Sequence, residues 1–251
     1  MCYKIIINPK YNNLSGFIEK IPEFISNGKG RIIYNKRNKV YDLITDDGTE
    51  LVVKKYKVPL LHQRFDYTFL RKSKAMRAYL YGLKLLELGI NTPEPIACLQ
   101  GYKNGLFHTG YFVSSPCYDE DFRVLADETH DKELINVLVE ELVMEHEKGF
   151  LHGDPNLSNY LFRLEKNEVG ERYIVTTIDI NRSKFIANPS QKQCLKRLVR
   201  ITHIRPLLME IIRLYAVSRK WDVDACQKYV IKHLDTMERN NRMKKYLKNH
   251  R

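Results

Sequence analysis

A polar stretch between apolar segments, residues 152–162, contains the residue types that phosphoryl transfer needs. Asp154 and Asn159 stand five residues apart, and a short hydrophobic strand, residues 160–162, follows at once. Phosphoryl transfer requires a carboxylate that orients the acceptor hydroxyl and oxygen ligands that hold magnesium on the phosphates. We therefore predict that Asp154 orients the hydroxyl and that Asn159 binds the metal ion.

A second carboxylate follows another apolar strand. Residues 173–178 read as a strand that ends at Asp179. If this strand pairs with residues 160–162 in a hairpin, Asn159 and Asp179 reach the same metal ion. The alternative is a polar turn in which Asp and Asn have only their usual loop roles. Asp179 favours the catalytic interpretation.

Three antiparallel strands are expected near the start of the chain, at residues 31–34, 39–44 and 50–57. Side chains alternate between the faces of a strand, so Lys54 and Lys55 point in opposite directions. We predict that Lys54, which follows an apolar run, faces the nucleotide and holds its phosphates as a point charge. Alternatively, Lys54 is one solvated lysine in a basic strand.

The remaining chain alternates between helical and extended patterns. Residues 1–30 read as a weakly helical lead-in, and residues 115–117 as a linker between two halves. Ser73 is expected to cap a helix that stops at Gly89. Further strands are predicted at 96–99 and 106–114, and further helices at 132–148, 195–217 and 225–247.

Composition indicates a globular protein. The 251 residues, 43% of them hydrophobic, suffice for one bilobal domain or two small ones. Because no apolar run approaches the roughly 18 residues of a spanning helix, neither a membrane anchor nor a signal peptide is expected. Five scattered cysteines without a C-x-x-C pair predict free thiols in a reducing compartment, by default the cytoplasm. His146 and His152 lack a cysteine partner at ligand spacing, which disfavours a zinc site.

The charge is strongly basic. Lysine and arginine number 42 against 30 acidic residues, for a net charge of +12. Such a balance favours an anionic partner, although it serves solubility equally well. A basic tail ends the chain and either touches an anionic surface or is a solvated helix end. Its residues are Arg239, Arg242, Lys244, Lys245, Lys248 and Arg251.

The order of these parts resembles the protein-kinase-like fold. A strand-rich lobe with a lysine, a helix and a linker precede Asp-x-x-x-x-Asn and a metal aspartate. The resemblance implies an α+β, bilobal fold, with a small antiparallel N-lobe at residues 1–114 and a mainly helical C-lobe at 115–251. Lys54 would be the strand lysine, and Asp179 would stand for the aspartate of Asp-Phe-Gly.

More narrowly, the chain is similar to the bacterial lipopolysaccharide kinase family, which phosphorylates Kdo or heptose of the inner core. The likeness covers roughly residues 20–190. The segments that carry it are 36–38, 51–56, 71–75, 89–96, 152–154 and 178–182.

Departures from the protein-kinase pattern concern the nucleotide side and the acceptor side. The first hairpin has no glycine, so Lys36, Arg37 and Asn38 are expected to cover the phosphates instead of close backbone amides. Ala78 stands where a helix glutamate would pair with Lys54.

On the acceptor side, Asp179 is followed by Ile180 and Asn181, and no Ala-Pro-Glu sequence appears. Gly153 replaces the arginine that pairs with a phosphorylated loop in regulated protein kinases. Little room remains for a peptide-docking segment, which favours a small-molecule or glycolipid acceptor.

The expected function is therefore an ATP- and Mg²⁺-dependent kinase that phosphorylates a core sugar of lipopolysaccharide or another anionic glycolipid. The expected location is cytoplasmic, with peripheral contact at the inner membrane. The alternatives are a kinase of this fold that acts on a protein or another small molecule, and a nucleotide-binding pseudokinase without catalysis. A nucleic-acid partner is not expected, because no aromatic-and-basic recognition motif is present.

Overall fold

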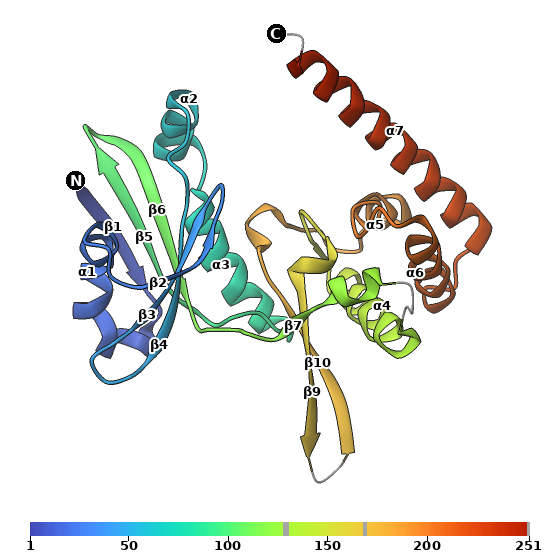
Figure 1. Ribbon diagram of the computed structural model, residues 1–251, viewed down its shortest axis with the longest axis horizontal. Coiled ribbons are helices and arrows are strands. Elements are labelled where there is room, and N and C mark those ends of the chain that lie inside the picture. Colours follow the sequence, from blue (N-terminus) through green and yellow to red (C-terminus); the bar gives the residue numbers. More distant parts are fainter. Residues whose placement is uncertain (128–130, 168–169, 250–251) are drawn as a thin grey trace. The chain divides into compact units, whose positions relative to one another are not determined.

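The computed structural model describes residues 1–127, 131–167 and 170–249 (Figure 1). The chain divides into two compact units. Unit 1 comprises Met1–Tyr118 and Asp179–Arg182, and unit 2 comprises Asp119–Ile178 and Ser183–Arg251. Residues 179–182 thus leave unit 2 and return to unit 1. Arg251, the last residue of the predicted basic tail, lies outside the described residues.

Unit 1 is described throughout, and within it six antiparallel strands form one sheet in the order β1-β5-β6-β4-β3-β2. The strands are β1 (Cys2–Ile7), β2 (Arg31–Asn35), β3 (Lys39–Ile44), β4 (Glu50–Lys55), β5 (Pro95–Lys103) and β6 (Leu106–Ser114). The helices are η1 (Pro9–Leu14), α1 (Ser15–Ser26), α2 (Leu61–Phe65), η2 (Asp66–Leu70), α3 (Lys74–Glu87) and η5 (Ile180–Arg182).

The two faces of this sheet pack against different helices. Ile18 and Ile21 of α1 belong to the same buried cluster as Val53 of β4. Met76 of α3 belongs to a second cluster, which contains Cys98 of β5. Because side chains alternate along a strand, one face of the sheet packs on α1 and the other on α3.

Two parts of unit 1 were not anticipated from the sequence. The predicted lead-in, residues 1–30, contains strand β1, whose partner β5 lies about ninety positions further on. The weakly helical pattern predicted for this lead-in is confirmed by α1, although the helix continues through Pro22. The helical segment formed by α2 and η2 had no counterpart in the expected pattern. Strand β1 was missed because its pairing partner β5 is distant in the sequence and leaves no local signal.

Unit 2 is mainly helical. Its helices are η3 (Phe122–Ala126), α4 (Lys132–Glu147), η4 (Leu157–Asn159), α5 (Gln191–Leu198), α6 (Arg205–Ser218) and α7 (Val223–Asn249). Its strands are β7 (Glu120–Asp121), β8 (Phe150–Leu151), β9 (Tyr160–Asn167), β10 (Gly170–Thr177) and β11 (Lys184–Phe185). Strands β9 and β10 form the predicted hairpin, with Tyr160 opposite Thr177.

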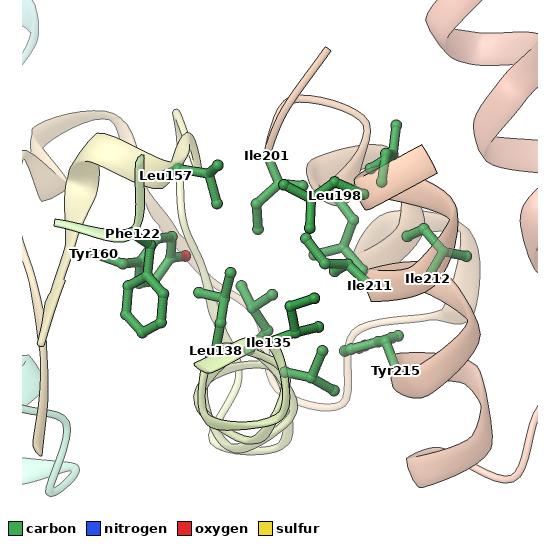
Figure 2. Close-up of a cluster of buried hydrophobic side chains, with 14 of the residues drawn as sticks. Phe122, Ile135, Leu138, Leu157, Tyr160, Leu198, Ile201, Ile211, Ile212 and Tyr215 are labelled. Carbon is green, nitrogen blue, oxygen red and sulfur yellow. The ribbon is translucent and has the colours of Figure 1, made fainter. Parts of the chain in front are cut away.

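The core of unit 2 reaches the predicted catalytic loop. Figure 2 shows Leu157 and Tyr160 together with Leu138 of α4 and Ile211 of α6, all of which belong to one buried cluster. Leu157 and Tyr160 lie on either side of residues 158 and 159. The core therefore fixes the loop at both ends of η4.

The single helix predicted at residues 195–217 is wrong, because the structure has two helices, α5 and α6, with residues 199–204 between them. Pro206 stands in the first turn of α6. A proline has no N–H and fits this position, whereas it would break the interior of a longer helix.

Across the described residues, none of the helices combines the length and the apolar character needed to cross a membrane.

Candidate active site

Hydrogen bonds of His152 hold the start of the predicted catalytic loop. The amide of Asp154 donates to Nδ1 of His152 at 3.0 Å. Nδ1 is therefore the acceptor nitrogen, and the proton on Nε2 is donated to the carbonyl of Ile178 at 2.9 Å. His152 is buried and ties Asp154 to the last residue before Asp179. This histidine has a structural role in the loop.

The amide of Asn159 closes the same loop. Its Nδ2 donates to the backbone oxygen of Asp154 at 2.8 Å, across the five-residue spacing. Its backbone oxygen accepts from the amide of Ile178 at 2.9 Å, which continues the pairing of β9 with β10. Since the nitrogen end of the amide is used within the loop, Oδ1 is the end that can bind a metal ion.

Glu145 of α4 lies under this loop and was not identified from the sequence. Its carboxyl group is fully buried and accepts hydrogen bonds from the hydroxyl of Tyr160 at 3.0 Å and from Oγ1 of Thr177 at 2.7 Å. Tyr160 follows Asn159 directly, and Thr177 is its partner on β10. The side chain of Glu145 therefore binds both β9 and β10 at the end where the predicted catalytic loop joins them.

The electrostatics of Glu145 are unusual. Burial raises the pKa of this carboxyl group well above its ordinary value, and the nearby Glu141 raises it further. Burial likewise raises the pKa of Glu141 to about 7. The sequence did contain a signal, because Glu145 follows Leu138 and Leu142 at helical spacing and so falls on the apolar stripe of α4.

Unit 1 brings Lys54 and Asp179 together. Nζ of Lys54 lies 2.8 Å from Oδ1 of Asp179, with 20% and 38% of the two side chains exposed. Lys55, the neighbouring lysine, points to the other face of the sheet, where its Nζ lies 5.6 Å from the ring centre of Tyr111. The strand lysine and the predicted metal aspartate are therefore direct partners.

The segment that carries Asp179 is fixed to α3. Asp179 adopts a positive φ of 55°, a conformation that is uncommon for residues other than glycine and that Asp adopts more readily than most. Nε of Arg77 on α3 donates to the carbonyl of Asn181 at 2.9 Å, and Nδ2 of Asn181 donates to Oδ1 of Asp179. Ala78, where a helix glutamate was sought, is buried in α3. Lys54 has Asp179 as its carboxylate partner instead.

Cationic side chains gather around Asp179 in unit 1. Burial lowers the pKa of Lys74, and three nearby cations lower it further: Arg37, Arg182 and Arg77. The negative charge of Asp179 raises the pKa of Lys74. Mutual repulsion of this kind indicates a region that would be stabilised by a bound anion.

The glycine-free hairpin supplies one of these cations. Arg37 belongs to the group around Lys74. Lys36 and Asn38 take part in the hairpin itself, since the amide of Lys36 donates to the carbonyl of Asn38 at 3.3 Å. Oδ1 of Asn38 also accepts from the amide of Lys57 at 3.3 Å. Nucleotide binding by all three residues stays a prediction.

The predicted residues are divided between the units. Lys54, Asp179 and the hairpin belong to unit 1, and Asp154 and Asn159 belong to unit 2. The oxygen chemistry fits magnesium: beside the Asp179 carboxylate, Oδ1 of Asn181 is buried without a hydrogen-bond partner among the described residues. Groups of three or more His, Cys, Asp or Glu side chains that could hold a metal are not found in the described part of the chain.

The chain was compared with known proteins by sequence and by structure. The sequence matches no protein-family model and no curated protein. The chain has an α+β, protein-kinase-like fold, as predicted. In particular, it is similar to a solved structure of WaaP in complex with acyl carrier protein, with a TM-score of 0.58 and 13% identity over 94% of this chain and 97% of that one.

A weaker likeness is found to the ADP/Mg²⁺-phosphoaspartate complex of Rio2 kinase from Chaetomium thermophilum. Its TM-score is 0.47, with 17% identity over 93% of this chain and 77% of that one. At such identities the similarity concerns the fold.

Proposed function

We propose that this protein is an ATP- and Mg²⁺-dependent kinase that phosphorylates a sugar hydroxyl, Kdo or heptose, of the lipopolysaccharide inner core. The observation that carries the proposal is the 2.8 Å pair between Lys54 and Asp179. A strand lysine and an aspartate from a distant segment thus lie side by side, and these are the residue types that hold the phosphates and the metal ion in kinases. The WaaP-like fold and the lipopolysaccharide-kinase motifs support the choice of acceptor.

Each site residue then has a defined task. Asp154 orients the acceptor hydroxyl and takes its proton, and Oδ1 of Asn159 joins Asp179 in holding the metal. Lys54 holds the phosphates by charge. MgATP supplies the phosphoryl group and the cation that offsets its charge. The hairpin residues Lys36, Arg37 and Asn38 cover the nucleotide.

The cationic surroundings of Asp179 favour an anionic acceptor. Four positive charges here exceed the single negative charge of Asp179. They belong to Arg37, Lys74, Arg77 and Arg182. Inner-core sugars carry carboxylate or phosphate groups, which such cations would bind. The proposed place of action is the cytoplasmic face of the inner membrane.

The direct test is phosphoryl transfer. Purified protein, labelled ATP and magnesium are mixed with extracted lipopolysaccharide, and the products are examined by mass spectrometry for the gain of one phosphate. Asp154→Ala should lower turnover by about three orders of magnitude or more while nucleotide affinity stays nearly constant. Glu19→Ala, an exposed carboxylate of α1, is the matched control. An Asp154→Ala protein with full activity would refute the assignment.

A pseudokinase is the second candidate, and one observation favours it. Lys54 is paired with Asp179, and the glutamate of α3, Glu87, stands at the very end of the helix. The lysine and the proposed metal ligand therefore neutralise each other. Such a protein would bind nucleotide without turnover. Magnesium-dependent ATP consumption would exclude it, and label on cell protein instead of glycolipid would indicate a different acceptor.

A further inference from the structure

A short helical segment of unit 1 exposes an unusual number of large apolar side chains. It comprises α2 and η2 with the residues around them. Leu61, Phe65 and Phe69 are 67%, 52% and 63% exposed, and the rings of Phe65 and Phe69 pack with centres 4.8 Å apart. The other exposed apolar side chains of the segment are Val58, Leu60 and Leu70.

The opposite side of the segment is anchored to strand β6. The ring of Tyr67 is buried and meets that of Phe107 edge-on at 5.4 Å. Nε of Arg64 donates to the carbonyl of Phe107 at 2.8 Å, and the amide of Phe107 donates to Oγ1 of Thr68 at 2.9 Å. Positions 64, 67 and 68 therefore face the sheet. The apolar positions 61, 65 and 69 project on the other side from a fixed support.

Positive charge surrounds this apolar face. Residues 57–72 contain four lysine or arginine residues and one acidic residue. Lys57 and Lys72, at the two ends, have exposed side chains. Arg71, also exposed, is paired with Asp66 at 3.0 Å. The segment thus combines protruding aromatic and aliphatic groups with unneutralised cations at its margins.

We propose that residues 57–72 dock unit 1 on the surface of an anionic lipid bilayer. Leu61, Phe65 and Phe69 enter the boundary between head groups and acyl chains, and Lys57 and Lys72 lie at the lipid phosphates. Interfacial segments of this composition bind through buried apolar area together with attraction to anionic lipid. A second copy of the chain fits less well, because its own cations would face those of the first.

This inference differs from the first of the two alternatives for the basic C-terminal tail, which is that the tail touches an anionic surface. Helix α7 also exposes apolar side chains, Met243 and Leu247 among them, between its lysines and arginines. The described part of the tail therefore provides a matched comparison of similar size and charge. The proposal concerns binding alone and does not depend on phosphoryl transfer.

The test is flotation of the full-length protein with vesicles of phosphatidylcholine, with and without phosphatidylglycerol. The wild-type protein should float with the anionic vesicles. The double variant Phe65→Ser/Phe69→Ser should bind them at least about tenfold more weakly, because two exposed aromatic groups are lost. Lys57→Gln/Lys72→Gln should weaken binding to the anionic vesicles only. Met243→Ser/Leu247→Ser should bind like the wild type.

Thermal unfolding of each variant verifies that the fold is retained, which is expected because the substituted side chains are exposed. The proposal is overturned if the wild type ignores anionic vesicles, or if the two phenylalanine substitutions leave flotation unchanged. It is also overturned if only the tail substitutions reduce binding. Self-association of the wild type that disappears in Phe65→Ser/Phe69→Ser, without vesicle binding, would assign the face to a second copy of the chain instead.

Discussion

Replacement of Glu145 tests the view that a buried, uncharged carboxyl group holds the predicted catalytic loop and the strand before Asp179. Two variants separate its roles. Glu145→Ala removes the group that accepts from Tyr160 and Thr177, whereas Glu145→Gln keeps a neutral group of the same shape. If Glu145 is uncharged in the folded protein, the glutamine variant should be close to the wild type.

The magnitude follows from the two hydrogen bonds. A buried polar group that loses its partner costs about 1–3 kcal/mol, so two unpaired hydroxyls in Glu145→Ala should lower the free energy of unfolding by about 3 kcal/mol or more. Glu145→Gln should cost less than about 1.5 kcal/mol, because its amide can accept from one hydroxyl and donate to the other.

The pH dependence has a defined sign. Because the pKa of Glu145 is raised on folding, the folded state holds this proton after the unfolded chain has released it. The stabilising contribution is complete below the ordinary glutamate pKa and is lost as pH rises toward the folded value. For Glu141 that window ends at a pKa of about 7. Between the unfolded and folded pKa values, each such carboxyl group lowers the free energy of unfolding by about 1.4 kcal/mol for every unit by which the pH rises.

Urea unfolding at about pH 5 and about pH 8 measures these effects. The only tryptophan of the sequence, Trp221, packs against Tyr215 in the core of unit 2, and its fluorescence reports on that unit. Glu140→Ala, an exposed glutamate of α4, is the control. The reasoning fails if Glu145→Gln is as destabilising as Glu145→Ala, or if the wild type does not lose stability relative to Glu145→Gln between the two pH values.

Two further predictions use matched pairs of residues. Gly149 has a φ of +76°, and a Cβ placed there would lie 2.6 Å from the carbonyl oxygen of Ile186. Gly105 has the same φ, but a Cβ placed there would meet no atom within 4 Å. Gly149→Ala should therefore lower the free energy of unfolding by about 1 kcal/mol more than Gly105→Ala, and equal losses in urea titrations would contradict the clash. Lys54→Met should weaken MgATP binding about tenfold or more, because a point charge on the phosphates is lost. Lys55→Met, on the other face of the sheet, should bind MgATP normally in calorimetry, and similar losses in both variants would argue against the role of Lys54.

Local signals in the sequence were sufficient for much of the fold. The alternating strands β2, β3 and β4 appear where hydrophobic periodicity placed them. Ser73 caps α3 by accepting a hydrogen bond from the amide of Met76, and Gly89 adopts the positive φ that a helix end favours. In each case the determining interaction joins residues only a few positions apart.

Interactions between distant residues could not be inferred in the same way. Strand β1 forms only because β5 offers it an edge. The break between α5 and α6 differs from this case, because Pro206 in the first turn of α6 is a local signal. The position of Glu145 on the apolar stripe of α4 indicates burial, but its partners Tyr160 and Thr177 lie on β9 and β10 and leave no local signal.

The partner of Lys54 illustrates why a search by homologous position failed. The resemblance to protein kinases directed attention to a glutamate on α3, where Ala78 stands, yet an ammonium group needs only some carboxylate at hydrogen-bonding distance. Asp179 provides it, because Arg77 and Asn181 hold the segment after β10 against α3. Asp179 itself has a positive φ, a left-handed conformation that Asp adopts more readily than most residues other than glycine. Its place beside Lys54 therefore depends on contacts between residues far apart in the chain, which the sequence alone does not reveal.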